Sequence, residues 1–193
     1  MKLIATALFI FIFSSIVFSQ AKDEREERIT LKEFPEPAIS LIKNLPKNCK
    51  KFKFYRETDG THKSFEAKFK YKKHLYSIEF NLKGIVEDIE QNIKFKEIDH
   101  DIKSKISNYF DGNFSKVKII KTQKQYLLIP DIDHSTQTRD ILTKEDKSHT
   151  NYEIIAEVQT NNKREFREFT FSGSGEIIAF RILNATSYEH VLY

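Results

Sequence analysis

Tryptophan is absent from the 193 residues, and cysteine and methionine occur once each. The single cysteine, Cys49, excludes an internal disulfide, so stability has to come from a packed core. Neither sign of charge dominates, because the sequence has 32 Lys and Arg residues and 28 Asp and Glu residues. A surface with mixed charge argues against a nucleic-acid partner. The 17 phenylalanines and 8 tyrosines that carry the aromatic content suit β-strands.

The first nineteen residues have the pattern of an export signal. Lys2 is followed by an apolar run from Leu3 to Phe18, and Ser19 ends a segment that suits signal peptidase. We expect residues 1–19 to be a signal peptide cleaved after Ser19; a retained membrane anchor is the alternative. No cysteine stands at the cleavage point, which argues against a lipoprotein. An exported chain without disulfides fits a bacterial periplasm or a secreted protein that leaves the membrane after cleavage.

The next segment, residues 20–33, is rich in charge and is interpreted as a solvated, flexible leader. A helix is expected to start near Pro35 and to end before Pro46, with an apolar stripe at helical spacing. Residues 51–56 alternate in polarity and predict a strand, and Asp59-Gly60 predicts a turn.

A three-stranded antiparallel meander is predicted for residues 64–95. Apolar and polar side chains alternate with a period of two, with turns at Lys72-Lys73 and at residues 81–84. This alternation places the apolar set on one face and a charged set on the other, which we expect to face water. The register predicts that Lys68 and Glu79 share the polar face.

The second half of the chain repeats this order. A helix with Asp99 as its N-cap and Gly112 as its C-cap precedes a strand at residues 114–121. Helix-to-strand junctions align at an offset of about 65 residues and the glycine turns at about 91. We therefore expect an α+β domain over residues 34–186, made of two repeats (34–97 and 98–186). Each repeat is a helix and four strands in one antiparallel sheet, with both helices on one face. The second repeat carries an insertion at about 123–150, and residues 187–193 form a C-terminal tail.

This order resembles the PepSY-like, β-lactamase-inhibitor-protein-like family of small exported bacterial proteins. The resemblance covers residues 34–183 and rests on patterns of spacing. They include Lys51-Phe52-Lys53-Phe54, the segment Ile78-Glu79-Phe80-Asn81-Leu82-Lys83-Gly84, and Phe171-Ser172-Gly173-Ser174-Gly175. It implies a concave antiparallel sheet backed by helices and a role in protein binding or inhibition. Tryptophan at Phe54 and aspartate at Asn81 and Ser172 would be usual for that family, so this chain departs from it there.

Residues that could carry chemistry are scattered. The acidic and histidine clusters Asp99-His100-Asp101 and Asp131-Ile132-Asp133-His134 could ligate a divalent cation, but they also suit a helix start and a turn. Cys49 lies at a strand start without the surroundings of a nucleophile. We therefore predict no enzyme, no cofactor, no catalytic residues and no metal ligands.

The charged face of the sheet is the remaining candidate site. It comprises Lys53, Tyr55, Glu66, Lys68, Lys70 and Glu79. Tyrosine with charges of both signs suits recognition of a protein partner. The sequence thus predicts a non-catalytic exported binding module, an inhibitor or regulator of an extracytoplasmic peptidase or hydrolase. The alternative is a small-ligand or divalent-metal binding protein of the cell envelope. The partner and the oligomeric state are not fixed by the sequence.

Overall fold

A computed structural model describes residues 21–22, 24–144, 150–161 and 163–184. The predictions for residues 1–19 and 187–193 fall outside these ranges. The described residues form one sheet of ten strands in the order β1-β10-β9-β8-β7-β6-β5-β4-β3-β2. Its strands are β1 (Ala21–Lys22), β2 (Glu24–Ile29), β3 (Lys50–Asp59), β4 (His62–Tyr71), β5 (His74–Asn81), β6 (Val86–Ile93), β7 (Lys116–Leu127), β8 (Thr150–Thr160), β9 (Lys163–Phe171) and β10 (Ile177–Leu183).

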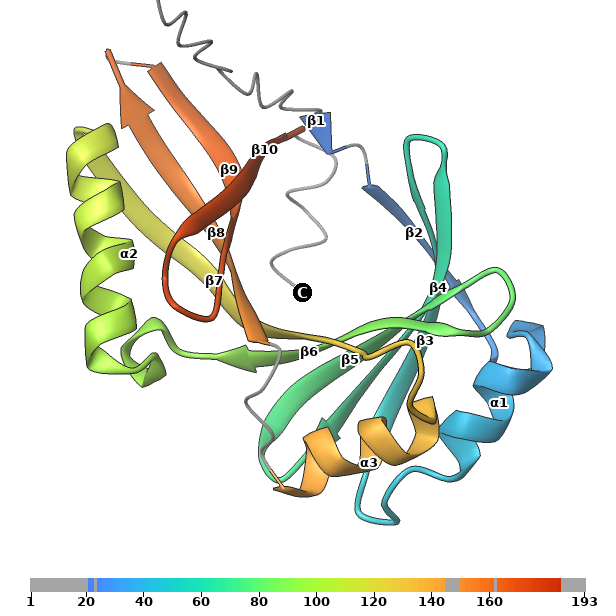
Figure 1. The fold of residues 1–193 in the computed structure, drawn as a ribbon. Coiled ribbons are helices and arrows are strands. Elements are labelled where there is room, and N and C mark those ends of the chain that lie inside the picture. Colours follow the sequence, from blue (N-terminus) through green and yellow to red (C-terminus); the bar gives the residue numbers. More distant parts are fainter. Residues whose placement is uncertain (1–20, 23, 145–149, 162, 185–193) are drawn as a thin grey trace, which may run out of the picture.

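Three α-helices cover the outer face of this curled sheet, α1 (Glu36–Lys43), α2 (His100–Asn113) and α3 (His134–Lys144), as Figure 1 shows. Short 3-10 helices, η1 (Leu31–Glu33) and η2 (Phe95–Glu97), precede α1 and α2. None of the described helices is long and apolar enough to cross a membrane. The predicted α+β class, with helices packed on one face of an antiparallel sheet, is confirmed. Among the described strands, β1 alone pairs in parallel, with β10.

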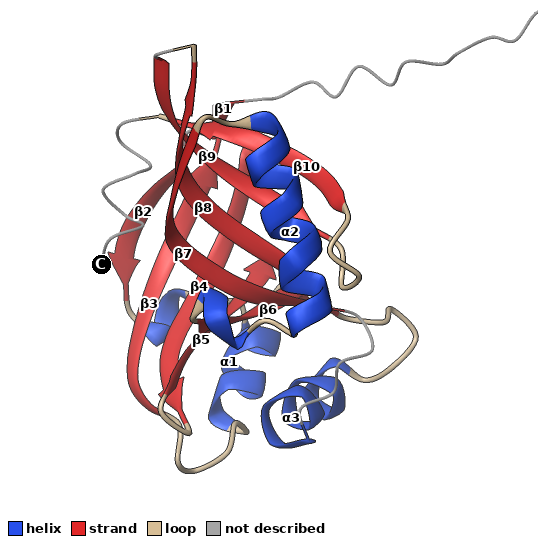
Figure 2. Cartoon of the chain, turned by 90° about the vertical axis from the view of Figure 1, so that its left-hand side faces the viewer, coloured by secondary structure: helices blue, strands red, loops and turns tan. Residues whose placement is uncertain are grey.

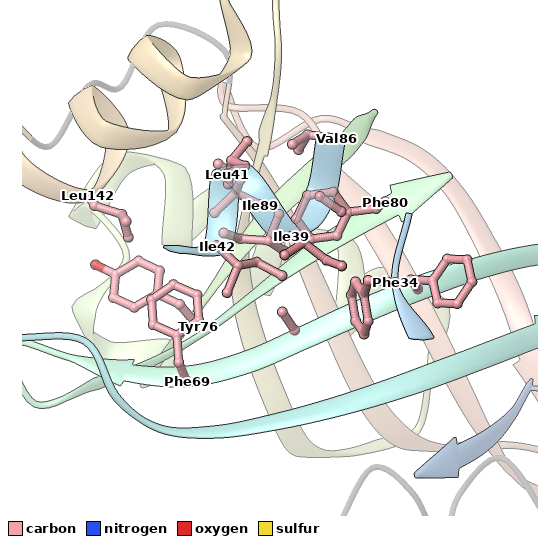
Figure 3. Packing of buried hydrophobic residues seen from close by; sticks show 14 of the residues in the cluster. Phe34, Ile39, Leu41, Ile42, Phe69, Tyr76, Phe80, Val86, Ile89 and Leu142 are labelled. Carbon is pink, nitrogen blue, oxygen red and sulfur yellow. The ribbon is translucent and has the colours of Figure 1, made fainter. Parts of the chain in front are cut away.

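Two hydrophobic cores lie between the helices and the sheet. In the first, Ile39 and Ile42 of α1 and Leu142 of α3 pack on Phe69 and Phe80 of the sheet (Figure 3). The second core joins α2 to β8 and β9, and its members include Ile106, Phe110, Ile154, Phe169 and Phe171. Helices α1 and α3 thus bury apolar side chains in one core and α2 in the other, so each half of the sheet has its own core.

The two glycine turns allow α1 and α2 to pack closely against the sheet. Gly84 has φ +77, and a Cβ there would lie 2.9 Å from Pro35 Cβ at the start of α1. Gly175 has φ +85, and a Cβ there would lie 2.9 Å from the Ile102 carbonyl oxygen in α2. A side chain is excluded at both positions by the backbone conformation and by the helix. Asn81 and Ser172 accept backbone N–H bonds within their turns, which confirms the predicted likeness of the turns. The element order is compatible with the predicted repeat, which stays a prediction.

The predicted meander is present in the predicted register. Glu66 pairs with Glu79, and Lys68 pairs with Ser77. Lys72 and Lys73 form the first turn with φ 44 and 75, as a two-residue hairpin loop requires. The even spacing of Ile85, Ile89 and Ile93 predicts that all three lie on the apolar face, but Ile85 is exposed and precedes β6, because Val86 takes the buried place opposite Phe80.

The interpretation of residues 20–33 as a solvated leader is wrong for its described part. Residues 24–29 form β2, which pairs with β3, and residues 21–22 form β1, which pairs with β10. These consecutive segments therefore join opposite edges of the sheet (Figure 1). The high charge of this segment is not typical of a strand. Glu27 points to the outer face of the sheet and pairs with Arg56 at 2.8 Å, whereas Glu24 and Glu26 point to the inner face.

The insertion also differs from the prediction. Strand β7 continues to Leu127, and the segment that follows contains α3, packed on the first core through Ile141 and Leu142. Gly112 does not cap α2; the helix ends at Asn113, where the Phe114 N–H donates to the Phe110 carbonyl. Figure 2 shows α2 and α3 as separate helices outside the sheet.

Candidate functional site

The polar face of the sheet is concave. Side chains from eight strands, β2 to β9, line one hollow, which is possible only if this face curves inward. We call this face the trough. Because the helices and both apolar cores occupy the convex face, the trough has no apolar layer over it in the part of the chain that the structure describes.

The six predicted surface residues lie together on the trough. Lys53 is opposite Lys68, and Tyr55 is opposite Glu66, which is itself opposite Glu79. Lys70 follows on the same side of β4. The expectation that this face is open to water is wrong for its centre: Glu66 is 7% exposed, and 31% of the Lys68 side chain is exposed. The structure has the predicted register but not the predicted solvent exposure, because the sheet curls more strongly than the strand patterns indicate.

One part of the trough is an acidic hollow of about 70 Å³. Nine carboxylates line it together with only two lysines. The carboxylates are Glu24, Glu26, Glu57, Glu66, Glu79, Asp88, Glu90, Glu153 and Glu168, and the lysines are Lys68 and Lys121. A neighbouring hollow of about 240 Å³ shares six of these carboxylates and adds Asp59, His62 and Arg181. For a chain with a formal net charge of +4, this is a marked local concentration of negative charge.

Crowding changes the acidity of these carboxyl groups. Burial raises the pKa of Glu57 far above its ordinary value, and the nearby charge of Glu66 raises it further. Burial also raises the pKa of Glu79 and of Asp88, with additional repulsion from Glu90 in both cases. Carboxylates taken out of water near like charges hold their protons more strongly. The hollow therefore favours protons or other cations.

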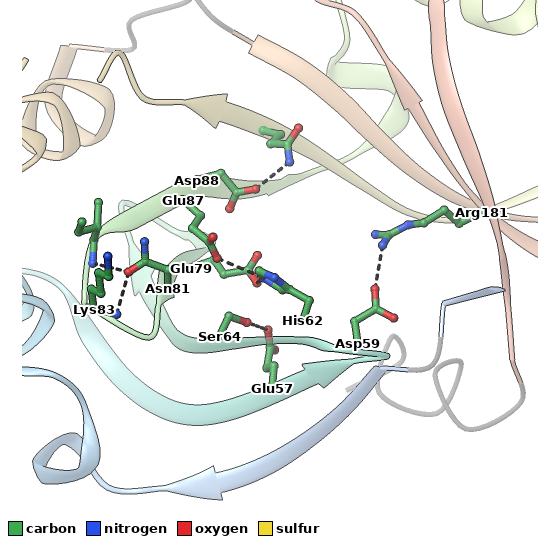
Figure 4. A network of polar contacts seen from close by, with 12 residues as sticks. Glu57, Asp59, His62, Ser64, Glu79, Asn81, Lys83, Glu87, Asp88 and Arg181 are labelled. Atoms are coloured by element: carbon green, nitrogen blue, oxygen red, sulfur yellow. Dashed lines mark hydrogen bonds and ion pairs between the residues drawn. The ribbon is translucent and has the colours of Figure 1, made fainter. Parts of the chain in front are cut away.

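Two basic side chains partly compensate this charge. Lys68 Nζ lies 2.7 Å from Glu26 Oε1 and 2.9 Å from Glu66 Oε2. Burial alone would lower the pKa of Lys68, but the charges of Glu66 and Glu26 outweigh it and raise the pKa. Arg181 of β10 donates to Glu168 and, at 2.8 Å, to Asp59 at the end of β3, so it ties the two edges of the sheet together (Figure 4).

The other part of the trough is a lysine hollow of about 340 Å³. Five lysines line it around an apolar floor that includes the exposed Leu75; they are Lys51, Lys53, Lys68, Lys70 and Lys121. Apart from Lys68, none of these lysines forms an ion pair with another residue that the structure describes. A bulge between Lys50 and Lys53 shapes this end, and Lys51 within it has φ 59, which is uncommon for a residue with a side chain.

Sequence reasoning missed most of the acidic hollow. Glu24, Glu26 and Glu57 belong to strands whose pairing across the sheet was not foreseen, and Glu153 and Glu168 come from the far half. A signal was present in the predicted leader, because Glu24 and Glu26 are two positions apart, as residues on one face of a strand are. What strand patterning could not supply is the curvature that brings them together.

The other candidates from the sequence have structural explanations. Asp99 caps α2 by accepting the Asp101 N–H at 3.1 Å, and His100 contacts only Asp101 among the described side chains. Asp133 caps α3 by accepting the Thr136 N–H at 2.7 Å, so the expected turn at residues 130–134 leads into a helix. Burial raises the pKa of the Cys49 thiol to about 11, which disfavours the thiolate needed for nucleophilic catalysis.

Comparisons with known proteins define the fold and no more. Neither a protein-family model nor a curated protein matches the sequence. Among solved structures, a DUF2874 family protein from Bacteroides ovatus is similar with a TM-score of 0.52 and 11% identity, over 77% of this chain and 87% of that one. A BLIP-like protein from Bacteroides fragilis gives a TM-score of 0.49 and 10% identity, over 77% and 86% of the two chains. A protein from Bacteroides eggerthii described as periplasmic gives 0.49 and 10%, over 77% and 88%. At 11% identity, the likeness to the Bacteroides ovatus protein shows a shared fold alone.

Proposed function

We propose that this protein is an exported, non-catalytic binding protein that holds an extended segment of an extracytoplasmic partner protein in the trough. The observation that carries the proposal is the separation of charge along the trough, with nine carboxylates around one hollow and five lysines around the next. A segment with basic residues at one end and acidic residues at the other would match this pattern in one direction only.

The acidic hollow supplies a driving force for binding. The carboxyl groups of Glu57 and Asp88 are buried and lie near other carboxyl groups, and burial first and repulsion second raise the pKa of both. A lysine or arginine side chain of the partner would relieve this repulsion and take the place of protons. Binding and stability are thus linked, because the bound cation would stabilise the folded state.

The lysine hollow supplies the second anchor. Leu75 is 45% exposed beside Lys70 and offers an apolar contact, and the lysines offer contacts to carboxylates of the partner. Both hollows are lined by Lys68, Ser77, Glu90, Lys121 and Gln123, so the two anchors are contiguous. A continuous segment can therefore occupy both.

Export is part of the proposal. It rests on the pattern of residues 1–19 and on the single cysteine, and the periplasmic description of a structure with a similar fold is consistent with it. Inhibition or regulation of a peptidase or hydrolase is the form of binding that the family resemblance implies.

Site-specific photo-crosslinking in the native cell envelope tests the proposal. A photoreactive residue is placed at Lys53 or Leu75 in the trough, and at exposed Glu36 or Asp111 on the helix side as matched controls. We expect one partner segment, identified by mass spectrometry, to be captured from the trough positions and not from the controls. Capture of equal strength from the helix side, or none from the trough, would contradict the proposal.

A further inference from the structure

Three potential metal ligands meet at the rim of the trough, outside the clusters that the sequence singled out. His62 begins β4, Glu79 lies in β5 and Glu87 lies in β6. His62 Nε2 is 3.3 Å from Glu87 Oε2 and 3.9 Å from Glu79 Oε1, and the three ligand atoms lie within 4.8 Å of one another. Figure 4 shows the three side chains pointing toward one another.

A β-bulge creates this arrangement. Glu79 pairs with Asp88, and the next residue, Phe80, pairs with Val86, so Glu87 is an extra residue in β6. Val86 is buried in the first core, while Glu87 reaches His62 and Asp88 lines the acidic hollow. In a regular strand, adjacent residues would point to opposite faces. The bulge therefore adds a second carboxylate from β6 to the trough side, which is how bulges re-aim side chains near functional sites.

The geometry points to a site for one zinc ion, held by His62 Nε2 and by one carboxylate oxygen each from Glu79 and Glu87. One imidazole and two carboxylates form a mixed nitrogen and oxygen set that suits Zn²⁺. Tetrahedral bonds of about 2.1 Å place ligand atoms roughly 3.4 Å apart. The separations from His62 Nε2, 3.3 and 3.9 Å, are close to this spacing, and the two carboxylate oxygens lie within 4.8 Å of each other.

The surroundings admit and favour such an ion. The His62 side chain is 55% exposed and those of Glu79 and Glu87 are about one-third exposed, so an ion can reach the site from solvent. His62 and Glu79 also line the 240 Å³ hollow, together with the carboxyl groups of Asp88, Glu90 and Glu153. Three protein ligands leave a fourth position for water or for a group of a partner. The zinc site does not require that the trough hold a polypeptide.

Isothermal titration of Zn²⁺ into the untagged protein beginning at Gln20 tests the site. We expect one equivalent to bind, and the His62→Ala and Glu87→Gln variants to weaken binding by at least about 100-fold, since each loses a direct ligand. His100→Ala is the matched control and should leave the affinity unchanged, because among the described residues His100 pairs with Asp101 and with no second carboxylate. Circular dichroism verifies that the variants fold.

Two further measurements distinguish zinc coordination from an ordinary ion pair. With Co²⁺ in place of Zn²⁺, the visible absorption of a tetrahedral site should appear in the wild type and disappear in His62→Ala. The ¹⁵N resonances of the His62 ring should shift on addition of Zn²⁺ while those of His100 do not. Absence of saturable binding, or binding that is insensitive to both His62→Ala and Glu87→Gln, would overturn the inference. Binding of Ca²⁺ in preference to Zn²⁺ would also overturn it, because Ca²⁺ selects oxygen ligands.

Discussion

Replacement of Glu57 by glutamine should remove much of an unusual pH dependence of stability. Glu57 is 8% exposed, and its Oε2 is 3.5 Å from the Ser64 hydroxyl. Burial, with the charge of Glu66 next, raises the pKa of this carboxyl in the folded state. In the unfolded chain the same carboxyl titrates near 4.5. The substituted amide has nearly the same shape and carries no charge, so it resembles the protonated carboxyl.

The sign follows from proton linkage. When the folded pKa is higher than the unfolded pKa, the folded state binds more protons between the two values. The stabilisation is complete below the unfolded pKa and is lost as the pH rises toward the folded pKa. For one proton the slope is at most about 1.4 kcal/mol per pH unit. Between pH 5 and pH 8, the wild type should lose up to about 4 kcal/mol relative to Glu57→Gln.

Urea unfolding followed by circular dichroism at pH 5, 6, 7 and 8 measures this difference. The two proteins should have similar free energies of unfolding at pH 5, and the variant should become the more stable one as the pH rises. Asp111→Asn changes an exposed carboxyl on α2 and serves as the control, which should run parallel to the wild type. Curves for Glu57→Gln and the wild type that stay parallel across the range would refute the reasoning, because Glu57 would then titrate alike in both states.

Two further predictions concern the fold. Gly84→Ala and Gly175→Ala should each lower the free energy of unfolding by about 2 to 4 kcal/mol, because each combines a positive φ with a collision against a helix. Gly60 has φ +58 and open space around it, so Gly60→Ala should lower the free energy of unfolding by only about 1 kcal/mol in the same denaturant titration. Equal losses of stability in all three variants would contradict the role of the Gly84 and Gly175 turns in helix packing. Arg181→Gln should lower the free energy of unfolding by about 1 to 3 kcal/mol, since it removes the partly exposed guanidinium that pairs with the buried Glu168. Hydrogen exchange should then accelerate at the β1–β10 edge before the centre of the sheet, and uniform exchange would count against a joining role for Arg181.

Local sequence patterns predicted many of the elements and the register around Lys68 and Glu79, but not the curvature. The alternation around Lys68 and Glu79 placed both residues on one face correctly, because a period of two is a local property of a strand. The exposure of that face depends on how ten strands twist and curl together, which no single strand encodes. The same patterns therefore predicted that this face is exposed to solvent, whereas Glu57, Glu66 and Glu168 on it are buried.

High local charge is the second reason why part of the fold could not be predicted from the sequence. The segment containing Glu24 and Glu26 has the composition of a disordered leader, and only its pairing with β3 makes it a strand. Its glutamates gain cationic and polar neighbours from distant strands, such as Lys68 for Glu26. Helix α3 was missed because Asp133 and Pro130 favour a turn as well as a helix start. The bulge at Glu87 likewise follows from long-range pairing and was not visible in the alternation of β6.

The affinity of a partner segment for the trough tests the central claim most directly. The segment captured by crosslinking from Lys53 or Leu75 is synthesised and titrated against the wild type and the Lys53→Gln/Lys70→Gln double variant. We predict that the variant binds about threefold to tenfold more weakly and that added salt weakens the wild type more than the variant. Equal affinities with equal salt dependence would show that the charged trough does not hold the segment.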